Sequence, residues 1–448
     1  MTPPGRGGIA AIRVAGRLSL RLLKKHFQSD QQGKQSFTPF MLKHGWFCHA
    51  DGARLDEVMA VYMPSGRSYT GMDQVEVYCH GGSEAVKQVL NELLKSGARA
   101  AEPGEFTRLA FLHGRIDLTQ AEAVGELIDA QTSVSYDAAR EHLSGAYTEH
   151  VNMLRSGLVE ILAETEAAID YPEDDIGPDG GAGLTKSLNE LMDQIRRLKE
   201  SYSAGRILRD GFKIVIAGRP NAGKSTLFNL LLRQERALVT ATPGTTRDYL
   251  SEWIDIEGIP VNLIDTAGLR IGGSQIEKAG QDLARRLISK CDLLIWIVDM
   301  SRKRWSSELQ ADLEDLGRMR KLLAGNKIDV LTKADQKLEQ SRHAHLMPIS
   351  CLSGQGVDEF SSSLSTIIRE SRPELTSGLV VTSARHQQKL QRALKQIRRA
   401  GKLLRLGESP ELVVFELQAA VTALDEITGR IYNDEILDRI FAKFCIGK

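Results

Sequence analysis

The sequence has no apolar run that approaches the ~18 residues of a membrane-spanning helix. Its N-terminus places Arg6 and Arg13 among glycines and has no short apolar segment, so it lacks the pattern of a secretory signal peptide. These two absences predict a cytoplasmic protein that does not associate with a membrane.

Cysteine is also scarce, and the five thiols lie far apart in the sequence: Cys48, Cys79, Cys291, Cys351 and Cys445. No two of them have the close spacing of a zinc site, and an odd number cannot form a complete set of disulfides within the chain. The cysteines are therefore expected to be the reduced thiols of a cytosolic protein.

The chain has no excess of either charge, because 58 lysines and arginines balance 58 aspartates and glutamates. A protein that relies on non-specific phosphate contacts is usually basic overall, so any nucleic acid is expected to bind a local patch or to need a partner. With 448 residues, 42% of them hydrophobic and 6% aromatic, the sequence is typical of a globular protein of roughly two to four domains.

Residues 1–117 have the pattern of a mixed α/β domain. The segments 44–50 and 55–64 flank an Asp-Gly turn and predict a β-hairpin, and "QVEVYCH" (74–80) alternates as a further strand. "SEAVKQVLNELLKSG" (83–97) begins at a serine and ends at a glycine, as helices do.

Residues 118–210 are predicted to be helical. "DLTQAEAVGELIDAQTSVSYDAAREHL" predicts one long helix or a pair, and "LVEILAETEAAIDY" a further helix before the acidic, glycine-rich break at 172–183. An apolar stripe then recurs at alternating spacings of four and three, which predicts a helix of a bundle: Leu184, Leu188, Leu191, Ile195, Leu198 and Tyr202.

Strand and helix patterns alternate across residues 211–377. The predicted strands are 212–218, 261–268, 292–300, 320–329 and 345–351. This alternation predicts a doubly wound, mostly parallel sheet. Residues 378–448 are again helical in pattern, so we expect 118–210 and 378–448 to form one discontinuous helical bundle into which the α/β domain is inserted.

The segment "GRPNAGKST" (218–226) fits the phosphate-loop pattern G-x-x-x-x-G-K-[ST] and lies between a predicted strand and a predicted helix. Gly218 and Gly223 allow the backbone N–H groups to curl around phosphates. Lys224 is expected to reach the β and γ oxygens of a nucleotide, and the Ser225 hydroxyl to bind Mg²⁺.

Three further segments support a nucleotide site, and the third of them specifies guanine. "GTTRD" (244–248) supplies Thr246 as a second hydroxyl for Mg²⁺, and "DTAG" (265–268) places Asp265 near the metal. "NKID" (326–329) supplies Asp329, which can accept hydrogen bonds from N1–H and the 2-amino group of guanine; adenine has neither. Asn326 and Lys327 are expected to brace this loop and cover the ring, and "SCLSG" (350–354) is a weaker match to a fifth base-contacting loop.

Leu269 follows the DTAG segment, where small signalling GTPases have a glutamine that orients the attacking water. Another group must therefore position the water. Asn221 could help to bind a monovalent cation together with carbonyls of 240–245, or it is only a turn-forming residue. Glu277 could orient water directly or through a second water, or it is only a solvated charge on a helix.

The order of these segments closely resembles the MnmE family of tRNA modification GTPases, also called TrmE. The resemblance extends over nearly the whole chain and includes "TPPGRGGIAAIRV", "HGG" (80–82), "EPGEFTRLAFLHGRIDLTQAEA" (102–123) and the terminal "FCIGK". Family members usually have a further strand before this N-terminal segment, so either the start lies elsewhere or the N-terminal sheet lacks an edge strand.

The resemblance implies an N-terminal domain that binds a tetrahydrofolate derivative, a 5-formyl or 5,10-methylene form, and makes a homodimer. It implies a GTPase domain activated by potassium and by its own dimerisation. It also implies a heterotetramer with the FAD-binding protein MnmG, which modifies carbon 5 of the wobble uridine of certain tRNAs to aminomethyl or carboxymethylaminomethyl derivatives.

The family's functional residues are transferred to this sequence one by one. Folate contacts fall on Arg13, Glu76, Arg115 and Lys448. Potassium ligands fall on Asn221, Thr240, Thr242 and Thr245, magnesium ligands on Ser225 and Thr246, and the water-orienting acid on Glu277. The expected GTP contacts are Asn221, Ala222, Gly223, Lys224, Ser225, Thr226, Thr240, Ala241, Thr242, Pro243, Gly244, Thr245, Thr246, Asp265, Thr266, Ala267, Gly268, Asn326, Lys327 and Asp329.

Cys445 lies four residues from the C-terminus and allows three interpretations. "CIGK" has the length of a prenylation box but not its chemistry, because Gly447 is not aliphatic and Lys448 is not a usual last residue. The apolar face of Ile436, Ile440, Phe441 and Phe444 could bury the thiol in the core. The resemblance implies instead a tail that delivers Cys445 to the bound folate as a nucleophile or proton donor.

Two competing functions follow from the motifs alone. The first alternative is a ribosome-assembly GTPase that binds RNA as a switch, although no G-x-x-G unit of the KH type follows the GTPase segment and the chain is not basic. The second is a membrane-recruited regulatory GTPase, which rests only on the C-terminal cysteine.

Overall fold

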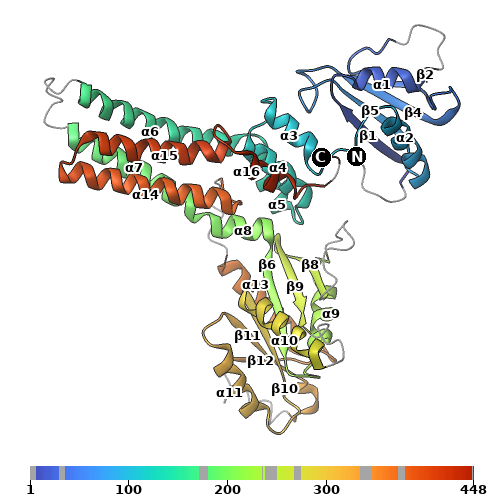
Figure 1. Cartoon of the computed structure of the whole chain (residues 1–448). Coiled ribbons are helices and arrows are strands. Elements are labelled where there is room, and N and C mark those ends of the chain that lie inside the picture. Colours follow the sequence, from blue (N-terminus) through green and yellow to red (C-terminus); the bar gives the residue numbers. More distant parts are fainter. Residues whose placement is uncertain are drawn as a thin grey trace. The chain divides into compact units, whose positions relative to one another are not determined.

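The computed structural model describes residues 7–29, 36–170, 180–234, 236–237, 250–266, 274–332, 345–371, 379–445 and 447. The chain divides into two compact units, drawn in Figure 1. The first unit comprises Met1–Gly125, His142–Leu188 and Lys395–Lys448, and the second comprises Glu126–Glu141 and Asn189–Leu394.

The first unit contains an antiparallel sheet of five strands in the order β1-β5-β4-β3-β2. Its strands are β1 (Ile9–Ala15), β2 (Phe27–Ser29), β3 (Lys43–Cys48), β4 (Arg54–Met63) and β5 (Gln74–His80). Apolar side chains from this sheet pack with α1 (Ser19–His26) and α2 (Ser83–Lys95) in a core that includes Ile12, Leu23, Phe47 and Leu93. The predicted hairpin, strand 74–80 and helix are confirmed.

Strand β1 did not follow from the sequence. Its residues are small or show only a weak alternation of apolar and polar side chains. Only Ala10 and Ile12 among them are buried, and Ile9 is 61% exposed. The strand is fixed by its antiparallel pairing with β5, which sets Arg13 opposite Glu76. A partner 63 residues away in the chain decides this element, rather than the local pattern.

Helices α6 (Ala146–Asp170) and α15 (Pro410–Thr428) of the first unit lie side by side (Figure 1). Helix α3 (Glu105–Leu112) packs against α16 (Asp434–Phe441), and Phe111, Leu118, Leu437 and Phe441 form a small core there. Segments that are far apart in the sequence thus pack together within this unit.

Four helices have residues in both units: α4 (Leu118–Asp129), α5 (Ser133–Leu143), α7 (Gly180–Glu200) and α14 (Ala384–Leu406). The segment predicted as one long helix or a pair is the pair α4 and α5. The apolar stripe of α7 buries Leu188, Ile195 and Leu198, but Tyr202 starts a separate helix, α8 (Tyr202–Asp210). Within the described ranges, no helix is long and apolar enough to cross a membrane.

The second unit contains a seven-stranded sheet in the order β12-β11-β10-β6-β9-β8-β7. Strands β6 (Phe212–Gly218), β9 (Ile259–Asp265), β10 (Leu293–Asp299), β11 (Lys321–Asn326) and β12 (Leu346–Pro348) are parallel. Strands β8 (Leu250–Ile256) and β7 (Arg236–Ala237) continue the sheet in antiparallel pairing.

Besides α8 and its share of α4, α5, α7 and α14, this unit contains the helices α9 (Lys224–Gln234), α10 (Ser274–Ser289), α11 (Trp305–Leu316) and α13 (Val357–Glu370) and the short 3₁₀ helix η2 (Ile328–Val330). Its core includes Phe212, Leu227, Ile295 and Phe360, all nearly inaccessible to solvent. All five predicted strands are present, and the doubly wound, mostly parallel sheet is confirmed. The carboxyl ends of β6, β9 and β11 therefore lie at one edge of the sheet, where α/β proteins bind ligands.

Candidate nucleotide-binding site

The phosphate loop connects β6 to α9 and needs glycine at two positions. Gly218 has φ +147°, and a Cβ there would lie 2.2 Å from the Ile297 carbonyl oxygen. Gly223 has φ +107°, and a Cβ there would lie 2.2 Å from Nδ2 of Asn326. Asn221 also has positive φ, +62°, a region that asparagine tolerates better than most residues. These conformations fix the loop in a tight curve ahead of α9.

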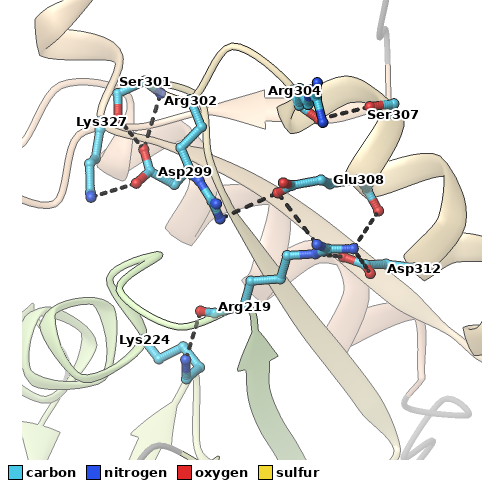
Figure 2. A network of polar contacts seen from close by, with 10 residues as sticks. All are labelled: Arg219, Lys224, Asp299, Ser301, Arg302, Arg304, Ser307, Glu308, Asp312 and Lys327. Carbon is cyan, nitrogen blue, oxygen red and sulfur yellow. Dashed lines mark hydrogen bonds and ion pairs between the residues drawn. The ribbon is translucent and has the colours of Figure 1, made fainter.

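Lys224 is the first residue of α9, and its side chain turns back over the loop. Nζ donates hydrogen bonds to the carbonyl oxygens of Gly218 at 3.1 Å and Arg219 at 2.9 Å. Figure 2 shows the contact with Arg219. The ammonium is nearly buried, so its charge is held at the loop and little screened by solvent.

Ser225 and Asp265 come together from two neighbouring elements. The Ser225 hydroxyl donates to the carboxylate of Asp265 at 2.8 Å, and Asp265 is fully buried at the end of β9. A hydroxyl and a carboxylate are hard oxygen donors, which suit Mg²⁺. The next residue, Thr266, donates its hydroxyl to the carbonyl of Ile216 at 2.9 Å and so anchors the strand end to β6.

Asn326 joins three loops at the edge of the sheet. Its Nδ2 donates to the carbonyl oxygen of Ala222 at 2.8 Å, and its Oδ1 accepts from the backbone N–H of Cys351 at 3.0 Å. The side chain is 3% exposed, so both hydrogen bonds are shielded from water. The residue braces the loop as predicted.

Lys327 and Asp329 flank a sharp turn. Lys327 has φ +69°, and its Nζ contacts the Asp299 carboxylate at 2.6 Å. Burial opposes ionisation of Asp299, but hydrogen bonds from Lys327 and Ser301 outweigh it and lower the pKa of this carboxyl group. Asp329 accepts a hydrogen bond from the Ser350 hydroxyl at 2.6 Å. The weakly predicted segment 350–354 thus lies beside the base-recognition loop.

These loops border one open cavity of about 670 Å³. It is lined by Pro220, Asn221, Gly223, Lys224, Ser225, Thr226, Asn326, Lys327, Asp329, Val330, Cys351 and Leu352. The predicted phosphate-loop and base-loop residues therefore lie around a single space. Such a cavity can take a nucleoside phosphate.

A network around Arg219 did not follow from the sequence. Figure 2 shows Arg219 directed towards α11, where Nη2 and Nε meet the Asp312 carboxylate at 2.9 and 3.1 Å. Glu308 contacts both Arg219, at 3.6 Å, and Arg302, at 3.3 Å. In the sequence, the only sign of this network was that Glu308 and Asp312 lie one helical turn apart. Their partner Arg219 lies 93 residues from Asp312, so the pairing could not be predicted. The network ties the phosphate loop to α11.

Several predicted site residues lie outside the described residues: Thr240, Ala241, Thr242, Pro243, Gly244, Thr245, Thr246, Ala267, Gly268, Leu269 and Lys448. Glu277 falls within α10, but its side chain is not described. The roles predicted for these residues therefore stay predictions. They are potassium binding, magnesium binding, folate binding and the orientation of water.

Two of the predicted folate residues pair across strands β1 and β5. Nε of Arg13 donates to the Glu76 carboxylate at 2.8 Å, and the Tyr78 hydroxyl donates to its other oxygen at 2.6 Å. The Arg13 guanidinium also lies over the rings of Tyr69, at 5.2 Å, and Phe106, at 5.5 Å. Burial, and secondarily Glu76, raises the pKa of Tyr78 to about 12, so this hydroxyl stays protonated and can donate.

Arg115 lies near the loop that carries Tyr69. Its Nη1 donates to the Gly66 carbonyl at 3.4 Å, and the side chain is exposed. An exposed guanidinium with only this weak contact suits a carboxylate ligand such as the glutamate of folate.

The thiol of Cys445 is exposed, which contradicts its burial in the core. The preceding ring, Phe444, packs against Phe441 at 5.5 Å between centroids and against Gly125. The apolar face therefore ends at Phe444, and Cys445 lies beyond it at the surface. Of the three interpretations of Cys445, the fold therefore rules out a thiol buried in the core.

The doubly wound sheet, the phosphate loop and the base-recognition loop define a P-loop protein of the GTPase class. A family model of the MnmE helical domain matches residues 118–445, and a model of the GTP-binding protein TrmE N-terminus matches residues 1–115. The chain belongs to the MnmE family.

Curated relatives agree over the full length. "tRNA modification GTPase MnmE" of Carboxydothermus hydrogenoformans is 39% identical over 455 residues, covering 100% of this chain and 98% of the relative. The protein of the same name from Thermotoga petrophila is 39% identical over 453 residues, and that from Alkaliphilus metalliredigens is 37% identical over 451, with the same coverage.

Proposed function

We propose that this protein is a GTP hydrolase that acts in the modification of the wobble uridine of tRNA. The observation that carries the GTPase part is the joining of the phosphate loop to the NKID loop through Asn326. This contact places the carboxylate of Asp329 in the same cavity as Lys224 and Ser225. Membership of a family whose curated relatives are named tRNA modification GTPases supports the tRNA part and favours it over ribosome assembly.

Each site residue has a defined task when nucleotide binds. Lys224 exchanges its hydrogen bonds to loop carbonyls for the β- and γ-phosphate oxygens, at little cost because it is already held at the loop. Ser225 and Asp265 would hold Mg²⁺, directly or through water, together with Thr246. When bound, the metal neutralises charge that develops on the phosphates. Asp329 selects guanine by accepting from N1–H and the 2-amino group.

Hydrolysis needs a group to position water, because Leu269 cannot. We assign this task to Glu277, and we assign K⁺ binding to Asn221 with Thr240, Thr242 and Thr245. A monovalent cation beside the β- and γ-phosphates would take the place of an arginine finger. Asn221 lines the nucleotide cavity together with Lys224 and Ser225, which supports its part of this assignment.

The modification chemistry is proposed for the N-terminal domain and the C-terminal tail. Arg13 and Glu76, already paired, and the exposed Arg115 suit the polar ring and the glutamate of a tetrahydrofolate derivative, with Lys448 as a further cation. Cys445, exposed, would act on the folate as a nucleophile or proton donor. The protein would act in the cytoplasm as a homodimer with an FAD-binding partner.

The test is GTP turnover by the purified protein in potassium and in sodium salts at equal ionic strength. We expect strong stimulation by potassium that is lost in Asn221→Ala, because the cation supplies transition-state charge stabilisation worth several kcal/mol. Lys87→Ala, an exposed change on α2, serves as the control and should respond to potassium as the wild type does. Equal slow rates in the two salts would contradict the proposal and point to a catalytic group from a partner.

A further inference from the structure

Positive charge in this neutral chain is concentrated on one helix, α14. This helix has eight lysines and arginines and no aspartate or glutamate: Arg385, Lys389, Arg392, Lys395, Arg398, Arg399, Lys402 and Arg405. The neighbouring bundle helix α15 has the opposite composition, with four acids and no lysine or arginine. An even mixture would be expected if these charges served only solubility.

The part of α14 within the first unit exposes mainly cations, and Leu406 at its C-terminal end is the exposed apolar residue, at 62%. Between residues 395 and 405, every residue in the exposed class is lysine or arginine. These are Lys395, Arg398, Arg399, Lys402 and Arg405, which we call the α14 cationic stripe. Their spacings of three and four residues place them on one face of the helix. On the opposite face, Ile397 and Ala400 are fully buried.

Among the described residues, most of the stripe has no counter-charge. Arg399 contacts Glu416 of α15 at 3.5 Å, and Nε of Arg405 donates to the Gly401 carbonyl of its own helix at 3.2 Å. For Lys395, Arg398 and Lys402, the described part of the chain provides no ion pair and no side-chain hydrogen bond. The helix dipole favours cations only in its last turn, which accounts for Arg405 but not for Lys395 or Arg398.

We propose that the α14 cationic stripe binds the phosphate backbone of tRNA. This inference rests on the proposed function, which supplies tRNA as the nucleic acid. Lys395 and Lys402 are about 10 Å apart along the helix axis, given its rise of 1.5 Å per residue. A straight row of cations of this length matches consecutive phosphates of an RNA helix, which proteins recognise mainly by shape and backbone contacts. The concentration of cations on α14 also explains how a chain without net charge can form a local phosphate-binding patch.

Two other occupants fit the surface less well. A protein interface of ordinary composition has aromatic residues and methionine at its centre, whereas the exposed residues at this end of α14 are five cations and the terminal Leu406. A helix that binds a membrane surface inserts its apolar face, but the apolar face of this segment is buried within the fold.

The test compares tRNA binding by full-length variants at several salt concentrations, with fluorescently labelled tRNA and polarisation as the readout. The stripe variant combines Lys395→Gln, Arg398→Gln and Lys402→Gln, which removes three charges that form no ion pair with any described residue. The matched control removes three exposed cations elsewhere in the first unit: Arg21→Gln, Lys24→Gln and Lys87→Gln. A charge-preserving variant, Lys395→Arg with Lys402→Arg, reports on any effect of mutation itself.

We expect the stripe variant to bind tRNA about tenfold more weakly or worse at low salt, with a salt slope reduced by roughly two to three. The control and the charge-preserving variant should bind as the wild type does. GTP turnover and the circular dichroism spectrum of the stripe variant should be unchanged, because none of the three residues touches the nucleotide site.

Equal affinity and equal salt slope for the stripe variant and the wild type would overturn the inference, as would equal losses in the stripe variant and the control. Failure of the wild-type chain to bind tRNA would also overturn it. Loss of binding to a purified protein partner, with tRNA binding intact, would assign the stripe to that partner instead. The proposed function fails by a different result, the absence of GTP turnover, which these measurements report separately.

Discussion

Asp329 combines a structural contact with the expected recognition of guanine. It accepts from the Ser350 hydroxyl at 2.6 Å and lines the cavity beside the phosphate loop. A carboxylate has four lone-pair positions, so one oxygen can hold the 350–354 loop while the group still accepts from guanine. The residue therefore positions a neighbouring loop and, in the proposed function, would also select the base.

Replacing Asp329 with asparagine should change the preferred base. The amide oxygen can still accept from Ser350, but the amide nitrogen donates where guanine also donates. Loss of two charge-assisted hydrogen bonds, at about 1.5–3 kcal/mol each, should weaken GTP binding by roughly 10²- to 10⁴-fold. Xanthosine triphosphate, with an oxygen in place of the 2-amino group, should regain affinity. Titration of GTP and xanthosine triphosphate against the variant measures the two affinities. Asp358→Asn, an exposed site on α13, serves as the control. Unchanged GTP affinity in Asp329→Asn would contradict the assignment.

The five thiols should differ sharply in reactivity. Burial raises the pKa of Cys79, Cys291 and Cys351 to about 11, so their thiolate fraction at pH 8 is about 10⁻³. Cys445 is exposed and should give the single fast phase with a disulfide reagent at pH 8, lost in Cys445→Ser. The slow phases should accelerate about tenfold per pH unit towards pH 11 as these thiols ionise. A fast phase that persists in Cys445→Ser would contradict the exposed position of this thiol.

The same variant separates the two activities. Cys445→Ser should leave GTP turnover unchanged, because Cys445 belongs to the first compact unit and the nucleotide cavity to the second. Wobble-uridine modification should be abolished, since serine is a much weaker nucleophile and acid than cysteine. Nucleoside mass spectrometry of tRNA treated with the reconstituted complex is the readout, and full modification by the variant would refute the role of this thiol.

At the scale of elements, the ion pairs of Arg219 link the phosphate loop to α11 (Figure 2). Arg219 precedes the loop residues that face the nucleotide, and its own carbonyl accepts from Lys224. The guanidinium is held by two parallel hydrogen bonds to Asp312, a geometry that lysine cannot reproduce. The position of the phosphate loop thus depends on a helix that provides no lining of the nucleotide cavity.

We expect Arg219→Gln to weaken GTP affinity several-fold while changing global stability by less than about 1 kcal/mol, because the pair is partly exposed and screened. Asp312→Asn should have the same effect, and the double variant should be no worse than either single one, which is the signature of one interaction. Isothermal titration of GTP against the three variants measures this cycle. Additive losses would show that the two residues act independently.

The sequence predicted elements well where the pattern was local. Strands β5 and β6 have the bounds read from their apolar runs, because each run ends at a polar or glycine residue. Helix α8 was merged with α7 because the apolar stripe continues through Tyr202, although the chain turns at Ser201. Strand β1 and the Arg219 network were missed because each depends on a partner far along the chain. Motif spacing found the site, and tertiary packing decides how it is braced.

At the scale of the whole molecule, the residues proposed for the modification chemistry and those proposed for nucleotide binding belong to different compact units. The nucleotide cavity lies in the second unit, and the predicted folate residues Arg13 and Glu76 and the exposed Cys445 lie in the first. Coupling between them requires a free-energy difference between nucleotide states that both units sense. Helices α4, α5, α7 and α14, with residues in both units, are the segments through which such a difference would pass.

The most direct measurement is the nucleoside composition of tRNA from bacterial cells whose own copy of this function is deleted and replaced by this chain. Cells with the wild-type chain should contain the aminomethyl-type wobble uridine. Cells with Lys224→Ala should contain the unmodified uridine, because the variant lacks the cation that reaches the nucleotide phosphates. Full modification with Lys224→Ala, or none with the wild-type chain, would contradict the claim that GTP hydrolysis at this site serves tRNA modification.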